Sequence, residues 1–403
     1  MSENETKKKK SLFSLRMPQG GDLPIHLSIL FLAIFGLLMI SSASMGLAVN
    51  NPLYLPITLA KQIVFLIAGY WFMRMFSASF SFDSLYSTHF GSWSLGIGAS
   101  LVAAGLSAAV GGSRAWIRIP ISGVDLTIQP SEFAKVMLIL IIAAYCGDIR
   151  KRYAKASDLW TKPVLFVLGY MFIVLIMQRD LGSMVVMGLI SLICFEIPSH
   201  PQLRRIQRVL ALILLIGIGS VFLILSPMGE KVIRYLPLQD YQINRILSAI
   251  NPFIDQYDAG FQLVNGLVSF ASGGWTGLGF GNSVRKYTKF PAANNDFILA
   301  IVVEELGIIG FALIFIPYCI IVFRLLNYAL KMKSERGKII LVGVAMYIVI
   351  HALFNIGGVT GMIPLTGVPL LMISAGGSST LSLMSAIGIA QAVIMRYKRG
   401  EFE

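Results

Sequence analysis

The sequence predicts an all-α, polytopic membrane protein with ten transmembrane helices, both chain ends in the cytoplasm (N-in, C-in) and a long extracellular loop between helices seven and eight. Composition, apolar windows and the distribution of basic residues all point to this class. Of 403 residues, 56% are hydrophobic and only 13% are charged, and the mean hydropathy is +0.75. Soluble domains carry about 25% charged residues, so this composition excludes an ordinary soluble protein.

Apolar windows of about 17 to 25 residues, the length that crosses the hydrocarbon layer, mark the predicted helices. They lie near 25–48, 57–76, 91–111, 131–147, 163–178, 181–197, 208–227, 296–324, 338–362 and 371–395. We take 25–395 as one membrane domain that includes the loop 228–295, between a basic N-terminal tail, 1–24, and a C-terminal tail, 396–403. The first apolar run lacks a small-residue cleavage site, so we expect it to be retained and not removed as a signal peptide.

Basic residues test this topology, because cytoplasmic loops carry an excess of Lys and Arg. With the N-terminus inside, 22 of the 33 basic residues fall on the cytoplasmic side and nine on the outer side. Topology and attraction to anionic lipid therefore explain the net charge of +13, and we expect no nucleic-acid partner. The long outer loop places function on the outer face, since connections of that length are usually functional.

Asp296 is the leading candidate for a catalytic residue. It stands between a glycine-rich segment that begins at Ser272 and an apolar run that begins at Phe297. An ionisable group at such a depth indicates function, whereas an N-cap of the following helix is an equally ordinary use of Asp. Farther along, Glu304 and Glu305 are adjacent in sequence, so we expect at most one of them to turn inward.

Glu132 and Lys135 open the fourth predicted helix in the stretch QPSEFAK and, three residues apart, share one helical face. A purely structural explanation has Ser131 as the N-cap and Glu132 near the positive end of the helix dipole. Lys135 does not suit that end. Its position favours an internal salt bridge or an anionic ligand.

Further polar residues on the outer side suit an anion. Arg114 and Trp116, in GSRAWIR, fit either a lipid-facing belt or a phosphate contact. In the long loop, Arg245, Ser283 and Lys286 surround the glycine-rich segment, whose glycines alone are weak support for a site.

The remaining polar residues indicate structure more than chemistry. We interpret His351 as a hydrogen-bonded core residue, and the small polar residues around Asn355 and Ser374 as helix-packing positions. The sequence contains no HExxH, CxxC or Walker motif and no evident Ser–His–Asp set. No cluster of ligands demands a metal.

A series of motifs in fixed order resembles the SEDS family (shape, elongation, division and sporulation), which includes FtsW, RodA and SpoVE. They are GGSRAWI, QPSEFAK, QRDLG, YQINRI, GFQ, SGGWTGLGFGNS, NNDFILAIVVEELGIIG, NIGGVTGMIPLTGVPL and ISAGGSS. The resemblance spans roughly residues 25 to 395. Within the family, GLGFGNSVRK is more similar to FtsW and SpoVE than to RodA, so we expect an FtsW-like member.

The resemblance implies a peptidoglycan glycosyltransferase that polymerises lipid II on the outer face of the bacterial cytoplasmic membrane, during cell division or cell-shape maintenance. It implies a class B penicillin-binding protein and other divisome or elongasome membrane proteins as partners. The family's essential aspartate falls on Asp296, its paired polar residues on Glu132 and Lys135, and its basic–aromatic motif on Arg114 and Trp116.

From this resemblance we expect Asp296 to act as general base on the acceptor sugar 4-hydroxyl, with inversion at the donor. Cations must meet the pyrophosphate leaving group, and the candidates are Lys135, Arg114, Arg245 and Lys286. A divalent cation (Mg or Mn) would assist the pyrophosphate, and no other cofactor is expected. A lipid II flippase and a non-catalytic scaffold that recruits a penicillin-binding protein are the alternatives.

Overall fold

The structure is a computed structural model that describes residues 20–109, 113–121, 124–147, 155–224, 226, 229, 240–253, 255–257, 260–288 and 290–401. It is a bundle of long helices, and the prediction of a helical fold is confirmed. A helix lies in each of the ten predicted segments. These helices are α1 (Leu23–Ala48), α2 (Tyr54–Ser79), α3 (Thr88–Gly105), α4 (Pro130–Cys146), α5 (Ala156–Phe172), α6 (Leu181–Glu196), α7 (Arg204–Ile224), α11 (Ile298–Lys331), α12 (Glu335–Val359) and α13 (Gly377–Lys398).

Several of these helices can cross a membrane. Within the described residues, seven are both long and apolar enough, judged by length and composition. The helices α3, α4 and α6 are shorter or less apolar, with 18, 17 and 16 residues. Ten crossings with both ends inside therefore stay a prediction.

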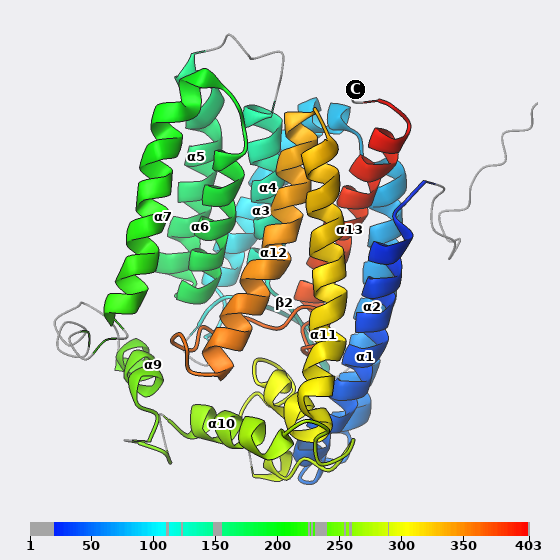
Figure 1. Cartoon of the computed structure of the whole chain (residues 1–403), viewed down its shortest axis with the longest axis vertical. Coiled ribbons are helices and arrows are strands. Elements are labelled where there is room, and N and C mark those ends of the chain that lie inside the picture. Colours follow the sequence, from blue (N-terminus) through cyan, green and yellow to red (C-terminus); the bar gives the residue numbers. More distant parts are fainter. Residues whose placement is uncertain are drawn as a thin grey trace, which may run out of the picture.

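Two short helices of the long loop lie across one end of the bundle. They are α9 (Asp240–Ile250) and α10 (Phe261–Gly273), and the C-terminus and the start of α1 lie at the opposite end (Figure 1). A turn of 3-10 helix, Arg285–Tyr287, follows in the same loop.

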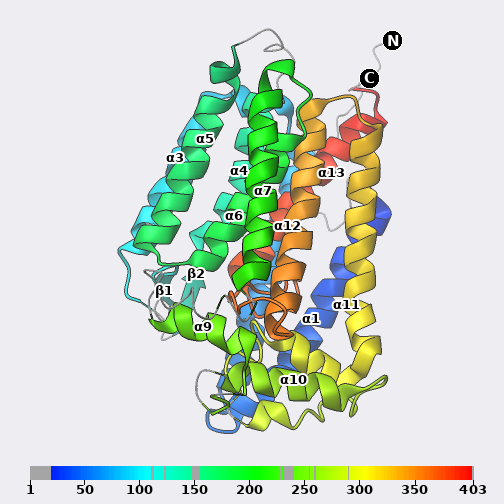
Figure 2. The same ribbon diagram turned by 60° about the vertical axis from the view of Figure 1, so that its left-hand side comes forward.

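A β-hairpin between α3 and α4 was not predicted. Its strands are β1 (Ile117–Ile121) and β2 (Val124–Ile128), which pair antiparallel with Ile117 opposite Ile128. The hairpin lies at the same end as α9 and α10 (Figure 2). Lys61 of α2 donates to the main-chain carbonyl of Asp125, 2.8 Å away, so the hairpin is tied to the bundle.

The helix α11 is broken at Gly307, where φ is +62° and ψ is −154°. The apolar window 296–324 predicted a helix here, as found, but gave no sign of this break. A Cβ on Gly307 would lie 2.4 Å from the carbonyl carbon and oxygen of Trp275, so only glycine allows this approach at this backbone conformation.

The glycine-rich loop restores the hydrogen bonds that the break removes. The N–H groups of Leu278 and Gly279 donate to the carbonyls of Glu304 and Glu305, and the N–H of Ile308 donates to Gly274. Buried backbone groups need such partners. The loop and the first turns of α11 therefore form one folded unit.

Close contact between α2 and α13 generates the first prediction. A Cβ on Gly388 would lie 2.4 Å from the carbonyl oxygen of Met73, whereas no atom lies within 4 Å of such a Cβ on Gly217 of α7. Gly388→Ala is expected to destabilise the protein by about 1–3 kcal/mol through overpacking. Gly217→Ala, the matched control, removes a flexible helix residue and should leave stability unchanged or raise it by up to about 1 kcal/mol.

Thermal unfolding of both variants in detergent measures the difference. A lower Tm is expected for Gly388→Ala alone. Equal Tm values for the two variants would contradict the packing of α13 on α2.

Candidate functional site

Asp296 lies half-buried at the end of the long loop, immediately before α11. The N-cap position of α11 falls on Phe297, which makes no side-chain capping bond. The structure therefore does not support the interpretation of Asp296 as an N-cap. Phe297 is fully buried and packs edge-on against Phe290, with ring centroids 5.3 Å apart, so an aromatic anchor fixes the chain directly after the carboxylate.

The main chain around Asp296 is held by hydrogen bonds to three consecutive carbonyl groups, those of residues 294 to 296. Each accepts a hydrogen bond from α12 or from the segment that precedes α13. The pairs are Asn294 with the N–H of Ala375 (2.9 Å), Asn295 with the hydroxyl of Ser374 (2.8 Å), and Asp296 with the amide of Asn355 (2.8 Å). We call this set of three contacts the Asp296 cradle.

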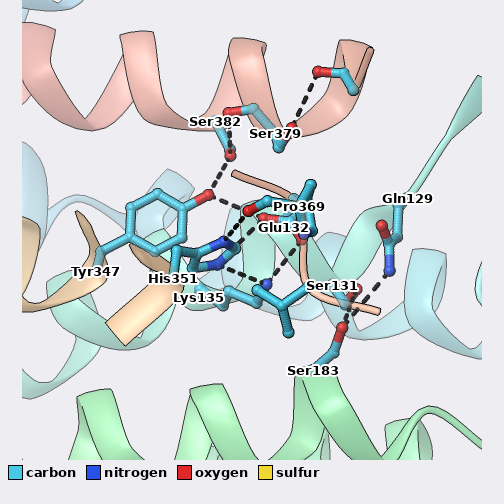
Figure 3. Close-up of polar contacts among 12 residues, drawn as sticks. Gln129, Ser131, Glu132, Lys135, Ser183, Tyr347, His351, Pro369, Ser379 and Ser382 are labelled. Carbon is cyan, nitrogen blue, oxygen red and sulfur yellow. Dashed lines mark hydrogen bonds and ion pairs between the residues drawn. The ribbon is translucent and has the colours of Figure 1, made fainter. Parts of the chain in front are cut away.

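A closed group of polar side chains lies inside the bundle between α4, α12 and α13 (Figure 3). Lys135 Nζ is 2.7 Å from Glu132 Oε1 and 3.0 Å from His351 Nε2. Tyr347 donates to Glu132 Oε2 at 2.9 Å, and its oxygen is 2.7 Å from the hydroxyl of Ser382. We call these five residues the α4–α12 cluster.

The hydrogen bonds of His351 define its role in this cluster. Its Nδ1 lies 3.3 Å from the carbonyl of Pro369, which can only accept. We assign the proton to Nδ1, which leaves Nε2 to accept from the ammonium of Lys135. The interpretation of His351 as a hydrogen-bonded core residue is confirmed.

The two explanations offered for the start of α4 can now be separated. The helix begins at Pro130 with Gln129 as N-cap, so the prediction that Ser131 caps it is wrong. Proline is favoured at the first helical position because its missing N–H has no helical partner there. Glu132 and Lys135 are each 1% exposed, and they form the internal salt bridge that was one of the two expected outcomes.

A second buried group joins the glycine-rich loop to α11. Lys286 Nζ lies 2.9 Å from Glu305 and 3.0 Å from the hydroxyl of Ser42 on α1. Glu305 also accepts from Ser42 and from the N–H of Gly281. Glu304 accepts from the hydroxyl of Ser283 and from the main-chain N–H groups of Val284 and Arg285.

Both glutamates are therefore turned inward, being 1% and 0% exposed. The expectation that at most one of Glu304 and Glu305 would do so is wrong. The break at Gly307 and the folded loop bring donors to both faces of this helical turn, which a regular helix alone would not do.

The remaining predicted substrate-binding residues are Arg114, Trp116 and Arg245. The N–H of Arg114 donates to the carbonyl of Gln178 at 2.8 Å, and its side chain is exposed. Trp116 is partly buried, and its carbonyl accepts from Ser107. Arg245 lies on α9, but its side chain falls outside the described residues.

Sequence reasoning missed the common feature of Tyr347, His351 and Asn355. Spaced four residues apart on α12, they lie on one face of the helix, and each is at most 3% exposed. Polar residues at that spacing in an apolar helix were the available signal. Within the described residues, no group of three or more His, Cys, Asp or Glu side chains lies close enough to hold a metal ion.

Comparisons with known proteins identify the family of this chain. A family model described as "Cell cycle protein", that of FtsW, RodA and SpoVE, matches residues 23–399. Relatives named "Probable peptidoglycan glycosyltransferase FtsW" include those of Francisella salina, 30% identical over 96% of this chain and 92% of the relative, and Bacillus subtilis, 31% identical over 96% and 93%. The relative of that name from Lactococcus lactis is 34% identical over 73% and 72%.

Solved structures show the same fold. The RodA protein of Thermus thermophilus superposes with a TM-score of 0.62 at 20% identity, over 93% of this chain and 97% of that one. A chain from a structure described as "Structural coordination of polymerization and crosslinking by a peptidoglycan synthase complex" gives 0.66 at 21% identity, over 95% and 99%. With the family model matched along nearly all of its length and relatives similar from end to end, this chain belongs to the FtsW, RodA and SpoVE family of cell cycle proteins.

Proposed function

We propose that this protein is a peptidoglycan glycosyltransferase that polymerises lipid II into glycan strands. The names of its relatives support the reaction, and the Asp296 cradle is the observation that carries the assignment to this chain. A half-buried carboxylate whose own main chain is fixed by three hydrogen bonds is suited to proton transfer, because a general base must be held within about 2.6–3.2 Å of the proton it takes.

In this mechanism, Asp296 removes the proton from the acceptor 4-hydroxyl as that oxygen attacks the donor anomeric carbon. The bond to the prenyl pyrophosphate breaks as the new glycosidic bond forms, so the electron pair leaves on the pyrophosphate. One displacement inverts the anomeric centre. This needs a base and no carboxylate nucleophile.

The pyrophosphate gains charge in this step and needs cations. Arg114 presents an exposed guanidinium, whereas Lys135 and Lys286 already neutralise Glu132 and Glu305. We therefore assign the pyrophosphate to Arg114 and, on sequence grounds, Arg245. A Mg²⁺ or Mn²⁺ ion carried on the pyrophosphate would share its charge.

The proposed setting is the bacterial cytoplasmic membrane, with Asp296 on the outer side and a class B penicillin-binding protein and other divisome or elongasome proteins as partners. The excess of basic residues in the predicted cytoplasmic segments over the outer ones supports this orientation. The position of α9, α10 and the hairpin at one end of the bundle, opposite the C-terminus, agrees with it (Figures 1 and 2).

Replacing the base tests the assignment. Asp296→Asn keeps the size of the side chain and removes its basicity, so glycan formation from purified lipid II should fall by at least about 10²–10⁴-fold. Product length and amount are measured with the candidate penicillin-binding partner present, and thermal unfolding checks that the variant is folded.

Asp125→Asn is the matched control, since this exposed carboxylate lies on the hairpin at the same end of the bundle. It should polymerise as the wild type does. Equal product from wild type and Asp296→Asn would rule out the base, and lipid II translocation in vesicles would then favour the flippase.

A third prediction concerns the α4–α12 cluster. Glu132→Gln or Lys135→Met alone leaves a buried charge unpaired and should cost about 3–5 kcal/mol of stability. The double variant removes both charges, so its Tm and its polymerising activity should recover together. Recovered Tm without activity would instead place Lys135 against the substrate, as the sequence first suggested.

A further inference from the structure

Asn355 holds two separate stretches of main chain with one amide group. Its Nδ2 lies 2.8 Å from the carbonyl oxygen of Asp296 and 2.9 Å from that of Val368. The side chain is 3% exposed. Both N–H bonds of the amide are therefore used on the two segments that meet beside the proposed base.

The orientation of this amide is fixed by chemistry. Both neighbours are carbonyl oxygens, which only accept, so the nitrogen must face them. The amide oxygen, Oδ1, is then buried without a hydrogen-bond partner among the described residues. An unpaired buried acceptor costs about 1–3 kcal/mol, yet the opposite orientation would set three oxygens against one another.

The helix that carries Asn355 is itself firmly placed. One turn earlier, His351 bonds to the carbonyl of Pro369, the residue next to Val368. Another turn earlier, Tyr347 bonds to Glu132 and contacts Ser382. Three side chains on one face of α12 thus connect the start of α4 and the 368–369 segment to the main chain of Asp296.

We propose that Asn355 is a positioning residue for Asp296. The inference rests on the proposed function, and it adds that catalysis depends on the amide of Asn355 through the main chain of the base and not through contact with substrate. Loss of the bond to the Asp296 carbonyl frees the chain from which the carboxylate projects. A misplacement of about 1 Å at a reacting group costs about 10²-fold in rate.

Gln391 supplies a matched control elsewhere in the fold. It is also a buried amide, 3% exposed, that clamps a main chain: its Oε1 accepts from the N–H of Asp22 at 2.7 Å and its Nε2 donates to the Asp22 carbonyl at 3.0 Å. Asp22 precedes α1, at the end of the bundle away from α10 (Figure 1). Asn355 therefore holds the main chain of the proposed base, whereas Gln391 holds a main chain at the other end of the bundle.

The experiment compares Asn355→Leu, Gln391→Leu and Asp296→Asn in the full-length protein with its penicillin-binding partner and purified lipid II. Both leucine variants should lower the Tm by similar amounts. The kcat of Asn355→Leu should fall about 10²-fold with KM changed by less than about threefold, because only the transition state is affected. Gln391→Leu should keep kcat within about twofold of wild type.

Asn355→Ser keeps one donor in a smaller side chain and carries the test if the leucine variant does not fold. Its kcat should lie between those of wild type and Asn355→Leu or, without that variant, below that of Gln391→Leu. A kcat no lower than that of Gln391→Leu, or a raised KM with kcat unchanged, overturns the positioning role. If Asp296→Asn polymerises normally, the assignment of Asp296 as the base is wrong, and the positioning role falls with it. If it is inactive while Asn355 variants keep full kcat, only this inference fails.

Discussion

Polar groups inside this bundle depend on partners within the protein, because the surrounding hydrocarbon supplies none. The face of α12 that carries Tyr347, His351 and Asn355 answers this requirement for several neighbours together. Together these side chains bond to α4, to the 368–369 segment and to the main chain just before α11, so the bonds that satisfy them also fix the positions of those segments. The main chain of Asp296, the proposed base, is thus held by side chains that are more buried than Asp296 itself.

Elements with a regular signal in the sequence, such as the helices, could be predicted. Contacts that depend on how a loop folds could not. The length of the apolar runs predicted the helices, and a spacing of three residues made the Glu132–Lys135 salt bridge one of two expected outcomes. The Lys286–Glu305 pair joins residues that are 19 positions apart and depends on how the chain between them folds, which a local spacing does not indicate. The hairpin 117–128 was missed because it lies in a short connection between two strong helical signals.

The glycine-rich loop shows why its sequence was a weak guide. Its glycines alone were weak support for a site, and the two that closely approach another element, Gly273 and Gly277, meet α11 at Val303 and Glu305. Its donors are directed largely at Glu304 and Glu305. Since α11 begins two residues after Asp296, holding the first turns of this helix also holds the main chain of Asp296.

Internal pairing also bears on the flippase alternative. That reading drew support from ionisable residues within apolar segments, which a translocation path for a charged head group would require. In the described part of the bundle, Glu132, Lys135 and His351 are almost fully buried and bond to one another. These bonds offset the free energy that it costs to bury their charges. A group that is neutral as a whole and closed to solvent offers little attraction to a pyrophosphate. The residues that suggested a path are therefore explained by the fold, and the flippase alternative loses the support that it drew from them.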